Sequence, residues 1–270
     1  MSGKDKFSFI QGIISNDVEI LKKKTSIYSS ILSPQGKFLT DFFLSVYDDS
    51  FLIEIHKDDE SLLMQKLNIY KLRSNVKLEV KKNVSVFLTS KDSHQDIVKL
   101  KFKFICFDDP RFNNFFRRLY IFNTPKQFNL TKNKLKIITP SIYNDIRLKN
   151  SIPDFNIDAI KNKSLLLEMR FDELNGISWN KGCYMGQEIT ARMKYRNIVK
   201  RKLFKIKIFF KGKVDKEVKF NGEEIGYITS HNKIDGFAYI NLKFLDKCLD
   251  KELLSGDSII KLEKLWWSND

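Results

Sequence analysis

The sequence is poor in the residues that cross-link a chain, ligate metals or break regular structure. Its 270 residues include three Cys, three His, five Pro and eleven Gly. Cys106, Cys183 and Cys248 are far apart and never form a C-x-x-C pair. The spacing therefore indicates no zinc or iron–sulfur cage, and the low Pro and Gly content excludes collagen-like or low-complexity chains. Sparse, unpaired thiols are typical of a reducing compartment, and we expect the cytoplasm.

Long apolar runs are absent as well. No stretch approaches 18 uncharged apolar residues, so no transmembrane helix and no membrane partner are expected. The first seven residues lack the apolar run and small-residue cleavage site of a signal peptide. Hydrophobic residues make up 42% of the chain and aromatic residues 13%. This composition excludes intrinsic disorder and predicts substantial cores. At about 150 residues per domain, this length predicts one to three domains.

The chain is strongly basic. Lys and Arg number 48 against 33 Asp and Glu, a formal charge of +15, and only nine of the basic residues are Arg. A Lys-rich composition arises in an AT-biased genome without any binding role, and a polyanionic partner is the alternative explanation. The charge is densest over residues 194–219, with eleven Lys or Arg and two Asp or Glu.

An alternating pattern lies within this basic stretch. It places aromatic and aliphatic residues on one face and lysines on the other: Phe204, Ile206, Ile208 and Phe210 against Lys205 and Lys207. This pattern predicts a barrel strand with a solvated basic face, while nucleic acid or an acidic protein are the alternative partners. RNA recognition normally adds exposed aromatics, and here the aromatics lie on the apolar face. Nucleic acid is therefore not expected as a direct partner.

The pattern of the first third predicts a mixed α+β unit. The expected elements, in order, are a helix over residues 4–21 interrupted near Gly12, a turn at 33–36, strands over 37–47 and 51–55, a helix capped by Asp58, and a strand over 76–80. Two strands, a helix and further strands are typical of a ferredoxin-like unit. Phe102, Phe104, Cys106 and Phe107 indicate another strand in the middle of the chain.

The last 70 residues predict a different architecture. The dipeptides Asn221-Gly222 and Asp235-Gly236 favour hairpin turns between short strands, and Gly256-Asp257 is expected to open a final strand. Short strands joined by such turns predict a small antiparallel barrel. We therefore expect an α+β core over residues 1–197 and a C-terminal β-barrel over residues 198–270.

One segment is far more specific than the rest. Lys181-Gly-Cys183-Tyr-Met-Gly186-Gln-Glu188 resembles the K-G-C-Y-x-G-Q-E signature of YgfZ-type proteins, relatives of the glycine-cleavage aminomethyltransferase. Weaker resembling pieces follow the family's order at residues 9–17, 33–42, 72–74, 109–111 and 147–153, so the resemblance covers nearly the whole chain. Ser151, residues 115–118 and Leu166 depart from the family pattern.

The resemblance implies a fold and a function. The implied fold is a GcvT-like arrangement of three lobes, two ferredoxin-like α/β lobes and a small β-barrel, around a central hole. The implied function is binding of tetrahydrofolate and assistance in iron–sulfur cluster assembly or repair, with an indirect effect on cluster-dependent tRNA-modifying enzymes. The expected partners are folate and iron–sulfur assembly or client proteins. Two alternatives are a folate-dependent aminomethyl or one-carbon transferase, for which no catalytic Asp is identifiable, and an RNA-binding accessory protein.

The signature contains the candidate thiol. If a helix begins near Gln187, Cys183 precedes its N-terminus, and Lys181 adds positive charge; both effects favour the thiolate, which Glu188 would oppose if close. The resemblance makes Cys183 the functional thiol and Lys181 its activator. Because clusters need about four protein ligands, contact of Cys183 with a cluster would be transient or shared, and no permanently bound metal is expected.

The resemblance also implies a set of folate-binding residues. Glu168 aligns with the family's P-x-E glutamate, and a carboxylate can accept the adjacent N–H donors of a pterin. Tyr143 would stack on a folate ring, and the same resembling segments supply Arg147, Gln187 and Glu188. The structural alternatives are an exposed helix position for Glu168 and a core position for Tyr143. Other residues are expected to be structural: Cys106, Cys248, Trp266, Trp267, His56, His94 and His231.

Overall fold

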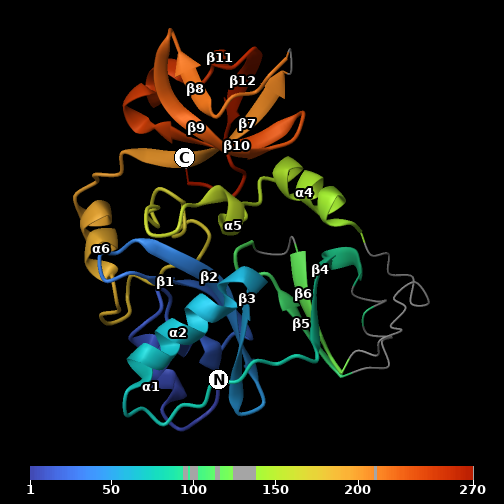
Figure 1. The fold of residues 1–270 in the computed structure, drawn as a ribbon, viewed down its shortest axis with the longest axis vertical. Helices are drawn as coiled ribbons and strands as arrows, with labels where there is room; N and C mark the ends of the chain where they lie inside the picture. Colours follow the sequence, from blue (N-terminus) through green and yellow to red (C-terminus); the bar gives the residue numbers. More distant parts are fainter. Residues whose placement is uncertain (94–96, 98–102, 113–115, 124–137, 210–211, 270) are drawn as a thin grey trace.

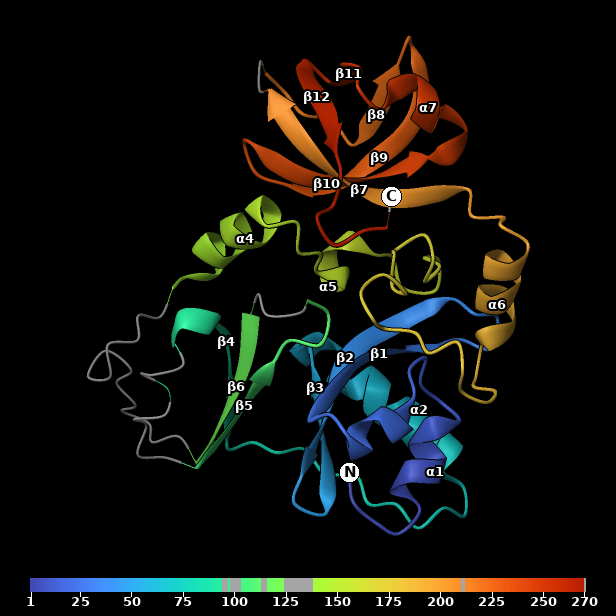
Figure 2. The same ribbon diagram turned by 180° about the vertical axis from the view of Figure 1, so that it is seen from behind.

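Three antiparallel strand assemblies organise the chain (Figure 1). The structure is a computed structural model that describes residues 1–93, 97, 103–112, 116–123, 138–209 and 212–269. The barrel lies at one end and the N-terminal sheet at the other, with the second sheet beside the N-terminal one (Figures 1 and 2). Helices α4 (Pro140–Lys149) and α5 (Phe155–Asp158) lie between the barrel and the two sheets. His94, Phe102 and Phe210 lie outside the described residues.

The N-terminal sheet is covered on both faces. It has the order β1 (Ser26–Leu32), β2 (Phe38–Tyr47), β3 (Ser50–Ile55). One face packs against α1 (Lys6–Gln11), the 3-10 turn η1 (Val18–Lys22) and α2 (Glu60–Lys71) in a core of aliphatic and Phe side chains. The other face carries Tyr28, Leu32, Phe38 and Phe43 into a second core that includes Phe171. Because side chains alternate along a strand, neighbouring residues of β1 and β2 serve different cores.

The second sheet is smaller. It has the order β4 (Val84–Ser90), β6 (Phe116–Phe122), β5 (Phe104–Asp108), and the 3-10 turn η3 (Lys91–Ser93) follows β4. Its own apolar cluster is made of Ile97, Leu119 and Ile121 with three partly buried neighbours. This sheet therefore depends on its contacts with the rest of the chain as well as on its own core.

The C-terminal barrel is closed, with strand order β10-β7-β12-β11-β8-β9. Its elements are β7 (Arg201–Phe209), β8 (Glu217–Phe220), β9 (Glu223–His231), β10 (Asp235–Asn241), the 3-10 turn η5 (Leu242–Phe244), α7 (Leu245–Cys248), β11 (Leu253–Ser255) and β12 (Ser258–Glu263). Phe204, Ile206 and Ile208 point into the barrel core, and Cys248 is buried among the same residues. The expected combination of α/β lobes with an antiparallel barrel is confirmed.

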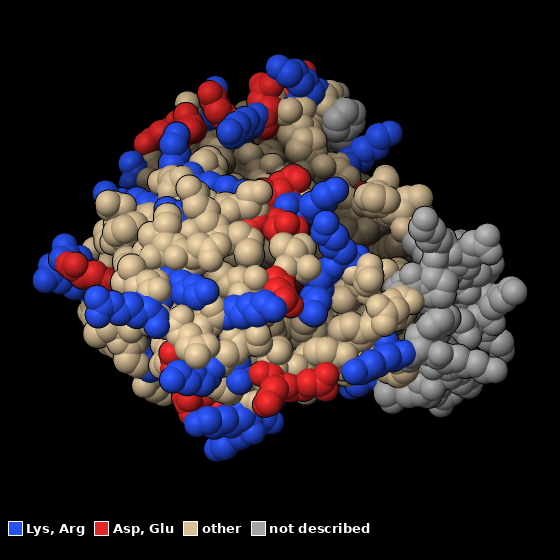
Figure 3. All heavy atoms as spheres, turned by 60° about the horizontal axis from the view of Figure 1, so that its bottom comes forward, with Lys and Arg blue, Asp and Glu red and all other residues tan. Residues whose placement is uncertain are grey.

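The lysines on the outer face of β7 are less available to a binding partner than the sequence indicates. Lys205 is 12% exposed in its side chain and pairs with Asp235 (3.4 Å) and Glu263 (3.2 Å). Lys207 pairs with Asp235 at 3.1 Å. Elsewhere Lys and Arg are spread over the face drawn in Figure 3, with Asp and Glu among them. The charge of β7 is thus partly neutralised within the barrel.

Several expected local features differ in the structure. Asp235-Gly236 begins β10 instead of forming the turn, because the Asn232 side chain accepts hydrogen bonds from the Ile234 and Asp235 N–H groups and closes the turn earlier. Residues 76–80 form a single bridge, Ser2–Lys77, in place of a strand. Helix α2 begins at Glu60 after the 3-10 turn η2 (Lys57–Asp59), so Asp58 does not cap it. In the part of the chain that is described, no helix is both long and apolar enough to cross a membrane.

The two tryptophans near the C-terminus join the barrel to the α4 segment. Helix α4 starts with Thr139 capping the Ile142 N–H and Pro140 in its first turn. The Trp266 and Trp267 indoles donate to the carbonyls of Asn150 (2.8 Å) and Ser151 (2.7 Å) just after α4. The expected structural role of these tryptophans as a lobe contact agrees with these bonds.

Two motifs 150 residues apart meet backbone to backbone. Gly36 in the turn after β1 and Gly186 before α6 (Gln187–Tyr195) both have positive φ, +72° and +79°. A Cβ on Gly186 would lie 2.4 Å from the Ser33 carbonyl oxygen, and one on Gly36 would lie 2.8 Å from the Gly186 carbonyl oxygen. Only glycine permits both this conformation and this approach.

Replacing Gly186 with Ala should therefore destabilise the fold. Positive φ and the clash with Ser33 together should cost about 1–3 kcal/mol of unfolding free energy, measured by denaturant titration. Gly182→Ala is the matched control, because a Cβ at Gly182 meets no atom within 4 Å. Its effect should stay within about 0.5 kcal/mol. Equal stability of the two variants would contradict the proposed close packing.

Candidate functional site

The signature loop is anchored on the end of α1. The Lys181 ammonium donates to three backbone carbonyls, Gln11 O (2.6 Å), Ile14 O (2.7 Å) and Asn16 O (2.8 Å). The Met185 N–H donates to Gly12 O at 3.0 Å. Burial lowers the pKa of Lys181 to about 8, partly opposed by Asp17. Lys181 thus caps carbonyl groups left unsatisfied where α1 ends.

Cys183 lies at the exposed part of this anchored loop. As expected, a helix follows at Gln187, four residues further on. An ammonium has three N–H donors, and those of Lys181 match the three carbonyls it contacts. A direct hydrogen bond from Lys181 to the thiolate would therefore require it to release a carbonyl. The activating role of Lys181 stays a prediction, and its observed contacts position the loop.

The first turn of α6 stabilises the loop from the other side. The Gln187 side-chain oxygen accepts from the Tyr184 N–H at 2.9 Å. Glu188 is exposed and pairs with Arg192 at 2.6 Å, one turn further along the helix. The Gln187 contact holds the end of the loop, the Glu188 pair lies within α6, and folate binding by Gln187 and Glu188 stays a prediction.

Aromatic and basic side chains share the surface beside this loop. The Lys194 ammonium lies 3.8 Å from the centroid of the Trp179 ring, and Tyr195 meets the same ring edge-on at 6.5 Å between centroids. Tyr195 is 74% exposed.

Glu168 is a buried, ion-paired residue and not an exposed helix position. Its carboxylate accepts from the Arg201 Nε at 2.9 Å, and its carbonyl accepts from the Leu203 N–H at 2.9 Å. Arg201 in turn lies over the rings of Tyr227 (5.5 Å) and Tyr239 (5.9 Å). The carboxylate predicted to bind the pterin is therefore fixed at the edge of the barrel beside an arginine.

Arg147 is fully buried between α4, α5 and the barrel. Its guanidinium pairs with Asp158 at 2.9 Å and donates from Nε to Asn144 at 2.8 Å. The other Asp158 oxygen accepts from Thr229 at 2.7 Å. The Arg147 Nη2 is buried and has no hydrogen-bond partner among the described residues. Arg147 thus joins three elements and retains one unused donor.

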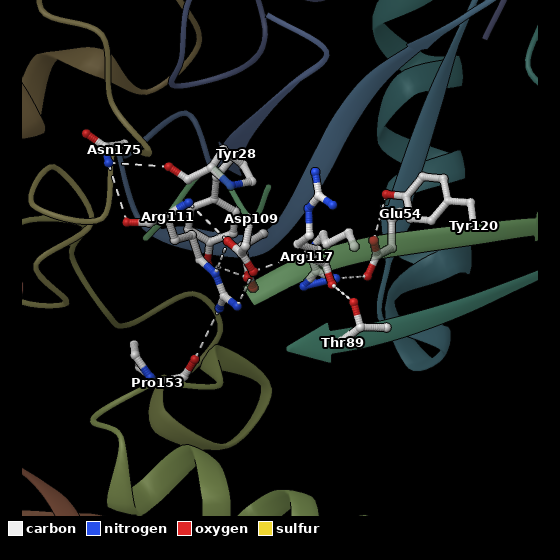
Figure 4. A network of polar contacts seen from close by, with 12 residues as sticks. Tyr28, Glu54, Thr89, Asp109, Arg111, Arg117, Tyr120, Pro153 and Asn175 are labelled. Carbon is white, nitrogen blue, oxygen red and sulfur yellow. Dashed lines mark hydrogen bonds and ion pairs between the residues drawn. The ribbon is translucent and has the colours of Figure 1, made fainter. Parts of the chain in front are cut away.

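A second polar cluster, the Arg111 cluster, lies where the two sheets meet (Figure 4). Arg111 binds Asp109 through two nitrogens, at 3.1 and 2.9 Å, and donates to Pro153 O at 3.4 Å. Burial raises the pKa of Asp109, but Arg111 and Arg118 outweigh it and hold that pKa below its usual value. The Arg118 guanidinium also reaches Glu54, which accepts from Tyr120 at 2.6 Å.

Tyr143 and Asp41 belong to the surroundings of Arg111. Tyr143 on α4 is half-buried. Burial raises the pKa of its hydroxyl, and the positive charge of Arg111 opposes this rise. Asp41 on β2 accepts from the Tyr28 hydroxyl at 2.6 Å. Burial raises the pKa of Asp41 to about 6, although Tyr28 and Arg111 act in the opposite direction. Tyr143 is therefore not an ordinary core aromatic but part of a charged environment.

The sequence reasoning assigned no role to Asp41, Asp109 or Arg111. All three occur in the resembling pieces, and one further signal marks Asp41: it is the one charged residue in a mostly apolar strand. In β2 it shares a face with Phe43, and Tyr28 of β1 is its diagonal neighbour across the ladder. The hydrogen bond between Asp41 and Tyr28 could be recognised only once the register of β1 and β2 was known.

The predicted site residues fall in three places, one of which is Glu168 beside Arg201 at the edge of the barrel. Lys181, Cys183, Gln187 and Glu188 lie at the start of α6, whereas Tyr143 and Arg147 lie on α4. These helices are on opposite sides of α5 in both ribbon views (Figures 1 and 2). Within the described ranges, no group of three His, Cys, Asp or Glu side chains is placed to hold a metal ion.

Comparisons with known proteins agree with this architecture. No family model matches the chain. It is 30% identical over 230 residues to the mitochondrial iron–sulfur cluster assembly factor IBA57 homolog of Neurospora crassa, covering 78% of this chain and 52% of that protein. The Dictyostelium discoideum homolog is 27% identical over 241 residues, covering 76% of this chain and 59% of that protein. The chain thus spans about half the length of these relatives.

The fold has a solved counterpart. The glycine cleavage system aminomethyltransferase T from Bartonella henselae superposes with a TM-score of 0.77 at 13% identity, covering 99% of this chain and 82% of that one. At this identity the likeness shows the fold alone. The names of the IBA57 homologs place them in mitochondria, so the cytoplasm stays a prediction for this chain. The comparisons support the resemblance in the signature: over about three quarters of its length the chain is similar to the IBA57 homologs, and it shares the fold of the glycine cleavage aminomethyltransferase.

Proposed function

We propose that this protein assists iron–sulfur cluster assembly or repair, with Cys183 as its functional thiol. The observation that carries the proposal is the exposure of Cys183 on a loop fixed by Lys181 and Gly186, in a chain related to iron–sulfur cluster assembly factors. A fixed, exposed thiol can ligate a cluster that a partner protein also holds. The cluster is cargo, because one thiol supplies only one of about four ligands.

Tetrahydrofolate is the proposed small ligand. The donor set fits it: the Glu168 carboxylate accepts N–H donors, Tyr143 is a half-buried aromatic, and Arg147 retains a buried N–H without a partner. Glu168 and Tyr143 would hold the pterin and an adjacent ring, and Arg147 would orient α4 through Asp158. Bound reduced folate would supply a carrier for one-carbon groups. The proposed partners are assembly or client proteins that meet the surface of Cys183 and Tyr195, and effects on cluster-dependent tRNA-modifying enzymes would be indirect.

Replacing Cys183 should abolish this function without unfolding the protein. Cys183→Ser removes the soft sulfur ligand at an exposed position, so unfolding free energy should change by no more than about 0.5 kcal/mol. In cells that lack the native protein, the activity of cluster-dependent enzymes should fall to the level of the empty vector. Cys106→Ser is the matched control, because that half-buried thiol lies on β5 away from the loop. Full activity with Cys183→Ser would remove the role of the thiol.

Replacing Glu168 should weaken folate binding. Glu168→Ala removes a charge-assisted acceptor, a contribution of about 1.5–3 kcal/mol, so the Kd for tetrahydrofolate should rise roughly tenfold to a hundredfold in equilibrium titration. Because the change also frees Arg201, Arg201→Ala is titrated beside it to separate loss of the carboxylate from loss of the ion pair. Equal affinities for wild type and Glu168→Ala would exclude Glu168 from the site.

A folate-dependent one-carbon transferase is the second candidate. The aminomethyltransferase fold favours it, and Asp41 offers a carboxyl whose pKa, about 6, suits proton transfer. Release of a formaldehyde-level carbon from an aminomethyl donor in the presence of tetrahydrofolate would support this activity. The RNA-binding alternative loses support, because Lys205 and Lys207 are paired with Asp235. The compartment proposed for this chain remains the cytoplasm.

A further inference from the structure

Arginine is scarce in this chain, and most of it is committed to ion pairs. Seven of the nine arginines pair with an Asp or Glu: Arg111, Arg117, Arg118, Arg147, Arg170, Arg192 and Arg201. Arg73 and Arg196 have no carboxylate partner among the residues that the structure describes. Because arginine is enriched in protein interfaces, these two are the first candidates for a contact with another molecule.

Arg196 stands at a well-defined end of α6. The Ile198 N–H donates to the Met193 carbonyl at 3.2 Å. The Asn197 N–H donates to the Lys194 carbonyl, also at 3.2 Å, and Asn197 has a φ of +49°. These two bonds form the Schellman arrangement that ends many helices. The backbone that carries Arg196 is therefore already fixed, so a contact with its side chain requires little ordering of the main chain.

Aromatic and aliphatic surface lies beside this arginine. Tyr195 is mostly exposed, and Ile198 is 48% exposed. In the part of the chain that is described, the Tyr195 hydroxyl forms no hydrogen bond. Tyrosine and arginine are the residue types that most often dominate protein–protein binding. We call Lys194, Tyr195, Arg196 and Ile198 the α6-end surface.

The α6-end surface carries positive charge that its own helix does not neutralise. Glu188 is the one acidic residue of α6, and it pairs with Arg192. Lys194 feels the charge of Asp172 but forms no ion pair within the described ranges. Helix α6 lies at the outer side of the molecule in both ribbon views (Figures 1 and 2). The surface is thus open and complementary to a carboxylate that has an apolar neighbour.

This surface is close to the thiol of the signature loop. Trp179 contacts both Lys194 and Tyr195 and precedes Cys183 by four residues. Four residues span at most about 14 Å between their Cα atoms. An interface of ordinary size covers about 800 Å² of each protein, which is roughly 30 Å across. One partner can therefore cover the α6-end surface and reach Cys183.

We propose that the α6-end surface is the docking site for an acidic segment of the protein that shares the cluster with Cys183. This inference rests on the proposed function and adds the contact that aligns the partner. An Asp or Glu of the partner binds the Arg196 guanidinium through both oxygens, and an apolar side chain next to it packs on Tyr195 and Ile198. Docking and cluster ligation are thus performed by different residues.

Charge reversal separates docking from ligation. Arg196→Glu should weaken docking roughly tenfold to a hundredfold, because it removes a charge-assisted contact. In cells that lack the native protein, the activity of cluster-dependent enzymes should fall at native expression and recover on overexpression, since mass action offsets lost affinity. Cys183→Ser should not recover at any expression level. Arg73→Glu, which reverses the other unpaired arginine just after α2, is the matched control and should equal wild type.

A photocrosslinking residue identifies the class of molecule that docks. In the same cells, p-benzoylphenylalanine in place of Tyr195 should attach to a protein segment rich in Asp and Glu. Arg196→Glu in the same chain should abolish that adduct. The same crosslinker at position 73 should not form it.

The outcomes separate this inference from the proposed function. Wild-type activity of Arg196→Glu at native expression, or a loss that overexpression does not restore, overturns docking and leaves the role of Cys183 intact. Full activity of Cys183→Ser removes the proposed function and docking together. Adducts with RNA in place of an acidic segment overturn protein docking. If Arg196→Glu lowers the thermal unfolding midpoint, Tyr195→Ser decides: a loss restored by overexpression supports the inference, and unchanged activity overturns it.

Discussion

Buried arginines hold the two sheets of the α/β part together, beside the stacked rings of Tyr47 and Phe122. Arg118 of β6 reaches Glu54 of β3 and lies 3.5 Å from Asp109, which Arg111 binds through two nitrogens. The ring of Phe43 lies close to both guanidiniums, 5.1 Å from Arg111 and 3.4 Å from Arg118. Removing one partner of such a network leaves a charge buried without compensation, at a cost of about 3–5 kcal/mol. The place of β5, and with it the surroundings of Asp41, depends on these contacts.

The segment between α4 and α6 connects the two candidate regions. At one end Arg147 and Asp158 fasten α4 and α5 to the barrel, and at the other Lys181 and Gly186 fasten the thiol loop to the N-terminal lobe. Each region therefore combines residues of at least two lobes. A fold of this kind presents its functional groups only when the lobes are assembled, which fits a protein whose proposed work depends on partners and a small ligand.

Local chemistry was predictable, and long-range pairing was not. Asn221-Gly222 forms its hairpin turn with positive φ at both residues, and α6 begins where the signature predicts it. The error at Asp235-Gly236 arose because the Asn232 side chain competes for the same backbone groups. The three carbonyls that hold Lys181 are 165–170 residues away, so no local pattern could reveal that this charge serves the backbone. Asp41 lies in one of the motifs that resemble the family, but its hydrogen bond with Tyr28 follows from the strand register, which the sequence alone does not reveal.

The anchoring of Lys181 has a consequence for synthesis on the ribosome. Its carbonyl partners belong to residues 11–16, up to 170 residues before it. At about 5–20 residues per second, the end of α1 waits roughly ten to thirty seconds before the lysine emerges. Until then the carbonyls of Gln11, Ile14 and Asn16 lack their ammonium partner, and the signature loop cannot be anchored. The loop that displays Cys183 can therefore be fixed only after the end of α1 and the signature have both been synthesised.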